Sequence, residues 1–156
     1  MSFAKAKEHL MQYGLDSRIM EFSVSSATVK EAANAIGCEE EEIAKTLSFL
    51  MNDQPVCIVA AGNCKIDNSK FKAEFHVKAK MIPFDSVETL IGHAAGGVCP
   101  FGVNENVTIY LDISLKKFKT IYPACGSSNS AVKLTVDELE LASDYVKWVD
   151  VCKNMQ

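Results

Sequence analysis

The stretch that decides the fold is Lys45-Thr46-Leu47-Ser48-Phe49-Leu50, followed after a short interval by Val56-Cys57-Ile58-Val59-Ala60-Ala61. Both runs are largely apolar and rich in β-prone residues, which is typical of strands. The interval contains Asn52-Asp53-Gln54-Pro55, a composition that favours a turn. The sequence therefore predicts two paired strands in a hairpin.

Helix signals lie on both sides of this hairpin. Phe3, Ala6, Leu10 and Met11 share one side of a helical wheel, which predicts an opening helix that stops at Gly14. Two capping boxes, Thr28-Val29-Lys30-Glu31 and Thr135-Val136-Asp137-Glu138, predict two helix starts, and Gly37 closes the first of these helices. We also expect helices from Cys38 through the acidic run Glu39 to Glu42, from Ser69 to Phe75, and from Ser86 to Leu90.

Further β-prone runs predict strands at Val107 to Leu111, Lys119 to Tyr122, Ala131 to Leu134 and Tyr145 to Val151. The connections between strands are often too short for helical crossovers, which favours a mixed, largely antiparallel sheet with flanking helices. The predicted class is α+β. A length of 156 residues without a repeat or linker predicts a single domain over residues 1–156.

The composition limits the possible functions. The first ten residues carry charges and no apolar run approaches about 20 residues, so we expect a cytoplasmic protein without a membrane segment. The six cysteines lack the spacing of zinc-ligand pairs, so we expect buried thiols, no metal and no cofactor. A net charge of −4 argues against binding nucleic acid through bulk electrostatics, so any RNA contact must be local.

A glycine-rich stretch from Gly92 to Gly102 carries the clearest sign of a site, with four glycines in eleven residues. Its part from Gly96 to Pro100 could bring backbone N–H groups close to an oxyanion or phosphate, although a bent loop without a ligand fits equally well. His93 and Cys99 could form a nucleophilic pair, or Cys99 could simply be packed. Lys45, at a strand start, could enter a cleft or remain solvated.

Four segments together resemble the YbaK/EbsC family of aminoacyl-tRNA deacylases, the prolyl-tRNA-synthetase-associated editing proteins, from about Ile19 to Val151. They are Thr28-Val29-Lys30-Glu31-Ala32-Ala33, Ile43-Ala44-Lys45-Thr46-Leu47, Gly96-Gly97-Val98-Cys99-Pro100-Phe101-Gly102 and Asp112-Ile113-Ser114-Leu115. The resemblance implies an open, barrel-like α+β fold. It also implies hydrolysis of the ester that joins an amino acid to the 3′-terminal ribose of tRNA.

The resemblance also implies site residues. Lys45 becomes the central functional residue, which we expect to hold the substrate because its amine is mostly cationic. The loop Gly96, Gly97, Val98, Cys99 and Pro100 would approach the aminoacyl group and the terminal adenosine. Further substrate contacts are expected from Thr46, His93, Phe101, Gly102, Asp67, Lys70 and Gly126. The RNA would contact local lysines such as Lys65, Lys70, Lys72, Lys78 and Lys80, unless these form only a solvated face.

Substrate and partners are implied less sharply. Some cysteine-specific relatives carry an aspartate shortly after the turn at Gly126, where this chain has Ser127 to Ala131, so Cys-tRNA(Pro) and Ala-tRNA(Pro) both remain candidates. With cysteine, the substrate's own thiol could attack the ester. The expected partners are a mischarged tRNA 3′ end and prolyl-tRNA synthetase, with the protein a monomer or weak dimer. Alternatives are a non-catalytic module that senses an amino acid or aminoacyl-tRNA, and a hydrolase using Cys99.

Overall fold

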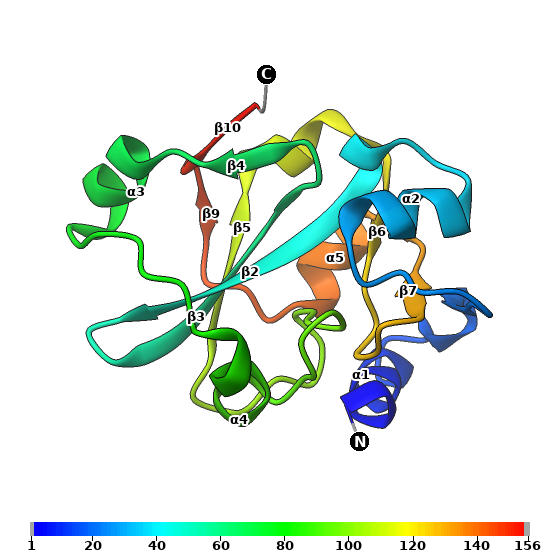
Figure 1. The fold of residues 1–156 in the computed structure, drawn as a ribbon. Helices are drawn as coiled ribbons and strands as arrows, with labels where there is room; N and C mark the ends of the chain where they lie inside the picture. The colour runs from blue at the N-terminus through cyan, green and yellow to red at the C-terminus, as the bar shows by residue number, and fades with distance from the viewer. Residues whose placement is uncertain (1, 155–156) are drawn as a thin grey trace.

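A six-stranded mixed sheet with the strand order β8-β6-β2-β3-β5-β9 forms the centre of the computed structural model, which describes residues 2–154 (Figure 1). The ends of the predicted domain, Met1 and residues 155–156, lie outside the described residues. The strands of this sheet are β2 (Ile43–Met51), β3 (Gln54–Ala61), β5 (Thr108–Asp112), β6 (Thr120–Pro123), β8 (Leu134–Thr135) and β9 (Trp148–Val149). Two separate antiparallel ribbons are formed by β1 (Ile19–Glu21) with β7 (Ser130–Val132), and by β4 (Cys64–Ile66) with β10 (Cys152–Asn154).

The β2–β3 hairpin is confirmed, but its turn is tighter than the composition predicted. The antiparallel register runs from Ala44↔Ala61 to Met51↔Gln54, which leaves a two-residue loop of Asn52 and Asp53. Both loop residues have positive φ, at 51° and 66°, as the favoured two-residue hairpin turns require. Gln54 and Pro55 therefore belong to β3 rather than to the turn.

The predicted α+β class with a mixed sheet is confirmed. Among the described residues, four strand pairings are antiparallel, and β2–β6, β3–β5 and β5–β9 are parallel. The parallel pair β3–β5 is possible because a long crossover joins them. That crossover contains α3 (Asn68–Phe75) and α4 (Val87–Ile91). In Figure 1, α3 and α2 (Val29–Ile36) lie on opposite sides of the long hairpin.

The remaining helices are α1 (Ser2–Met11) and α5 (Val136–Ala142). Both predicted capping boxes are present, at Thr28 and Thr135, and Gly37 ends α2 in the left-handed conformation with φ of 85°. No helix within residues 2–154 is long and apolar enough to cross a bilayer.

Some local predictions were wrong. The acidic run forms only a 3₁₀ turn, η2 (Glu40–Glu42), because β2 begins at the next residue. The helix expected from Ser69 begins at Asn68, and Asp67 caps it: its Oδ1 accepts hydrogen bonds from the N–H groups of Ser69 and Lys70 at 3.0 and 3.1 Å. The expected strand from Tyr145 to Val151 is replaced by β9 and β10, which join different sheets.

The predicted strand from Ala131 to Leu134 is also divided, between β7 and β8. The two strands pair with different partners, β1 and β6. At the break, Lys133 donates its N–H to the Arg18 carbonyl at 3.2 Å. One β-prone run thus serves two sheets.

Aromatic packing joins the hairpin to the crossover. The ring centroids of Phe49 on β2 and Phe71 on α3 lie 5.2 Å apart, and both side chains are almost completely buried. Phe71 also contacts Phe75 at 4.9 Å.

Replacing Phe71 with alanine should lower the free energy of unfolding by about 3–5 kcal/mol, because it empties a fully buried aromatic site. Phe84 is the matched control, since its side chain is 77% exposed and Phe84→Ala should change stability little. Urea unfolding of both variants measures the difference. Equal stability losses would contradict this account of the core.

Candidate functional site

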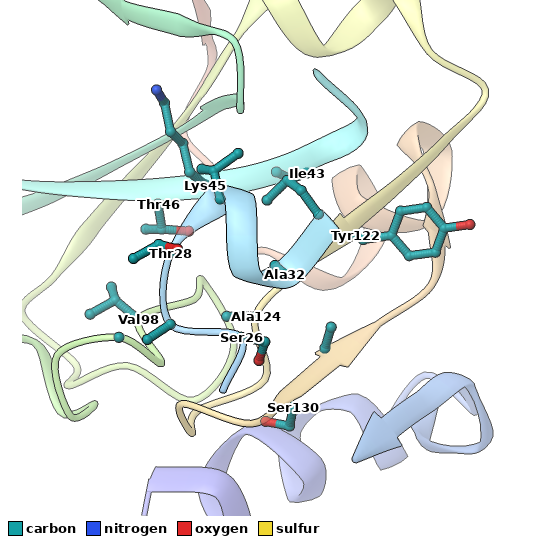
Figure 2. A pocket seen from close by; sticks show the side chains of 15 residues that line it. Ser26, Thr28, Ala32, Ile43, Lys45, Thr46, Val98, Tyr122, Ala124 and Ser130 are labelled. Carbon is teal, nitrogen blue, oxygen red and sulfur yellow. The ribbon is translucent and has the colours of Figure 1, made fainter. Parts of the chain in front are cut away.

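A cleft of about 150 Å³ opens beside the first half of β2 (Figure 2). Its walls come from the segment before α2, from α2 itself, from β2, from the glycine-rich loop, and from the β6–β7 region. The lining residues are Ser26, Ala27, Thr28, Val29, Ala32, Ile43, Ala44, Lys45, Thr46, Gly96, Val98, Tyr122, Ala124, Ser130 and Ala131. Segments far apart in the sequence therefore meet at one strand.

The cleft exists because one edge of β2 is only partly paired. β6 pairs with Ile43 and Ala44 at one end of that edge. Near the other end, Ser48 O accepts from Ile82 N–H at 3.0 Å and Leu50 N–H donates to Lys80 O at 2.9 Å. Backbone groups of alternate strand residues point to the same edge, so those of Thr46 face the gap between these pairings.

Thr46 also brings a side-chain oxygen to this gap. Its Oγ1 is buried and has no hydrogen-bond partner among the described residues. In Figure 2 the Thr46 side chain points toward Thr28, across the cleft. A buried hydroxyl without a partner is costly, so a ligand that supplies one would be favoured.

The glycine-rich loop is held against the turn at Gly126. Gly126 N–H donates to Gly97 O at 2.9 Å, and a Cβ on Gly97 would lie 2.4 Å from Ser127 N. Gly97 N–H donates to Ala94 O, whereas the N–H groups of Gly96 and Val98 make no hydrogen bond to another backbone group within residues 2–154. Both Gly96 and Val98 line the cleft.

The other walls combine small apolar side chains with hydroxyl groups. Ser26 Oγ donates to Ser128 O at 3.3 Å, and the Ser130 and Ser127 hydroxyl oxygens lie 2.5 Å apart. Thr28 Oγ1 accepts from Glu31 N–H at the start of α2. The apolar lining includes five alanines, which leaves room for a small group.

Lys45 borders the cleft, but its ammonium group points elsewhere. In Figure 2 its side chain leaves β2 on the opposite side from Thr46. Nζ donates to the carbonyl oxygens of Gly62, at 3.3 Å, and Cys64. Partial burial lowers the pKa of this amine from its usual value.

The aminoacyl-tRNA editing domain model matches residues 24–141. The chain belongs to this family. The matched range therefore contains every residue that lines the cleft, from Ser26 to Ala131.

Individual relatives agree with this assignment. The chain is 46% identical to the uncharacterized protein YwhH of Bacillus subtilis (strain 168) over the whole of both chains. It is 26% identical to EbsC of Enterococcus faecalis (strain ATCC 700802 / V583), whose name proposes a Cys-tRNA(Pro)/Cys-tRNA(Cys) deacylase, over 76% of this chain and 73% of EbsC. A crystal structure of a proposed trans-editing enzyme for prolyl-tRNA synthetase superposes with a TM-score of 0.86 at 26% identity, covering 98% of both chains.

Four of the residues predicted from sequence meet at the cleft of the editing domain: Lys45, Thr46, Gly96 and Val98. Gly97 within the loop accepts a hydrogen bond from Gly126 behind it, which holds the loop in position. Asp67 caps α3, and Lys70 lines a separate cavity with Asp150. Pro100 and Gly102 border another depression beside His9.

Cys99, His93 and Phe101 form a fully buried cluster beneath the loop. His93 Nε2 lies 2.6 Å from Phe101 O and 3.5 Å from Cys99 Sγ, and His93 Nδ1 has no partner among the described residues. The proton is thus assigned to Nε2, which cannot then accept one from the thiol. Burial lowers the pKa of His93 and raises that of Cys99 well above its usual value, so neither charged form is favoured.

Sequence reasoning missed most of the cleft walls. Thr28 and Ala32 were noticed as part of a segment that resembles the family, but not as site residues, and Ser130 was noticed only as part of the segment after Gly126. Ser26 carried no distinguishing pattern, and Tyr122 was only the end of a predicted strand. Within the described residues, no three His, Cys, Asp or Glu side chains gather as metal ligands would.

Thiol alkylation of the native protein tests the burial of Cys99. Iodoacetamide should modify Cys38 alone, since it is half-buried and the other five cysteines are buried. Burial and the nearby negative charge of Glu42 raise the pKa of Cys38, so its labelling should be slow near neutral pH and accelerate as the pH rises. Mass spectrometry locates the label, and Cys38→Ser is the control. Labelling of Cys99 in the folded protein would overturn this arrangement.

Proposed function

We propose that this protein is a trans-acting deacylase that hydrolyses the ester bond of a mischarged tRNA, most favourably Cys-tRNA(Pro) or Ala-tRNA(Pro). The observation that carries the proposal is the small cleft between the open edge of β2 and the glycine-rich loop, where the N–H groups of Gly96 and Val98 have no backbone hydrogen-bond partner within residues 2–154. The Cys-tRNA(Pro)/Cys-tRNA(Cys) deacylase activity in the name of EbsC supports the cysteine substrate, and the description of the structural relative supports editing in trans. Prolyl-tRNA synthetase is the proposed partner.

The chemistry follows from the charge that develops on the ester. When water attacks, the carbonyl oxygen becomes an oxyanion, and we assign the N–H groups of Gly96 and Val98 as its hydrogen-bond donors. A preorganised donor of this kind contributes roughly 3 kcal/mol to the transition state. This route needs no protein nucleophile, which agrees with the buried position of Cys99.

Lys45 is assigned to substrate binding rather than to proton transfer. An ammonium group has three donors, and the carbonyls of Gly62 and Cys64 take two of them. The third can contact a ribose or phosphate oxygen of the terminal nucleotide. A lysine held in this way retains its proton and remains a fixed positive charge.

The size of the cleft favours a small amino acid. A cavity of 150 Å³ holds a group about the size of benzene. The side chains of alanine, cysteine and serine fit within this limit, with the ribose left at the opening. Thr46 Oγ1, which has no partner among the described residues, can bond to the α-amino group or the ester.

Release of amino acid from charged tRNAs tests the function directly. The panel is cysteine, alanine, serine and proline, each on tRNA for proline. We expect rapid loss of one mismatched amino acid with prolyl-tRNA spared, and a rate about ten- to hundredfold lower in Lys45→Ala, the effect of losing a charged hydrogen bond. No release from any substrate, with tRNA still bound, would indicate a binding module instead.

Filling the cleft should block the reaction. Ala32→Leu adds three carbons to the wall formed by α2, and we expect kcat/KM for the preferred substrate to fall at least about tenfold, because overpacking excludes the aminoacyl side chain. Ala35→Leu on the same helix is the matched control, because Ala35 is not among the lining residues. Steady-state deacylation and thermal melting of both variants distinguish blockage from unfolding. Equal activity in the two would show that substrate binds elsewhere.

A further inference from the structure

A second cavity of about 390 Å³ lies beyond Lys45, between the β4–β10 ribbon and the turn that follows β5. Three lysines and two aspartates are among its lining side chains: Lys70, Lys117, Lys153, Asp112 and Asp150. The three lysines are exposed to solvent. This cavity is larger and more polar than the cleft.

The two carboxylates of this cavity already have partners. Asp112 is buried and accepts from the N–H groups of Ser114 and Val151, both at 2.9 Å. Asp150 pairs with Lys70, with Nζ and Oδ1 3.1 Å apart. Lys117 and Lys153 have no ion-pair partner within residues 2–154. Their positive charges are therefore available to an anion.

The strand register adds a further positive charge. Lys65 on β4 lies directly opposite Lys153 on β10. Like charges in such a cross-strand pair destabilise the pairing, and a bound anion would remove that cost. Both side chains are exposed in a protein whose net charge is −4, so this is a local concentration of positive charge.

Lys45 connects this cavity with the cleft. Its stem borders the cleft, and its ammonium group donates to the carbonyl of Cys64, a residue that lines the second cavity. An RNA strand whose terminal ribose lies at the cleft could therefore pass the positive charge of Lys45. Its preceding phosphates would then reach the second cavity.

We propose that Lys117 and Lys153, with Lys65 beside them, bind backbone phosphates of the single-stranded 3′ end of tRNA. The inference rests on the proposed function, because it places the ester in the cleft. In this proposal the second cavity provides affinity for RNA, whereas the cleft recognises the amino acid.

Charge reversal provides the test, with uncharged tRNA as the probe, so that binding is measured independently of hydrolysis. Lys153→Glu should weaken tRNA binding about tenfold in fluorescence anisotropy. It should also make the dependence of log Kd on log salt shallower by about 0.7 for the lost single-strand contact. The fold should not suffer, since glutamate opposite Lys65 replaces a repulsive pair with an attractive one. Lys153→Arg should retain binding.

Lys133→Glu is the matched control, because this substitution changes the net charge by the same amount as Lys153→Glu. Lys133 is also exposed, and it is not among the residues that line the cavity. It should leave tRNA binding near the unmodified level, and Lys117→Glu should weaken binding as Lys153→Glu does. Equal losses in Lys153→Glu and Lys133→Glu would overturn the proposal. So would displacement of tRNA by micromolar inorganic phosphate at constant ionic strength, which would indicate a site for a free anion.

Discussion

The arrangement on which the rest depends is the unequal pairing of β2. One edge is bonded to β3 along nearly its whole length, so the strand is fixed in the core. The other edge is shared between β6 and the chain around residues 80–82, and neither covers Thr46. A strand that is rigid on one side and open on the other presents backbone groups to a ligand at little cost in ordering.

The glycine-rich loop can approach that open edge only because side chains are missing behind it. Gly97 packs against the backbone of Ser127, and Gly126 packs against the backbone of Ser2 on α1, where added Cβ atoms would lie 2.4 Å from the nearest atoms. The buried cluster of His93, Cys99 and Phe101 fills the space beneath. The position of the loop thus explains these residues, and Gly96 and Val98 are the loop residues that line the cleft.

What the sequence could predict was local. The hairpin and both capping boxes depend on residues that are close together in the sequence, and the structure confirms them. The predictions failed where tertiary contacts determine the local structure. The strands β9 and β10 separate because Asp67 N–H donates to Val151 O and Asp112 accepts from Val151 N–H. The cleft walls contributed by Ser26 and Ser130 depend on contacts about one hundred residues apart, which no sequence spacing reports.

The resemblance identified Lys45, yet only the structure gives the direction of its side chain. Strand alternation sends Lys45 and Thr46 to opposite faces of β2, so the two neighbours cannot serve the same part of a substrate. Thr46 faces the cleft, and Lys45 reaches toward the β3–β4 turn and the second cavity. The proposal that the cleft holds the amino acid while the second cavity holds RNA depends on this alternation, because it directs two neighbouring side chains into different surroundings.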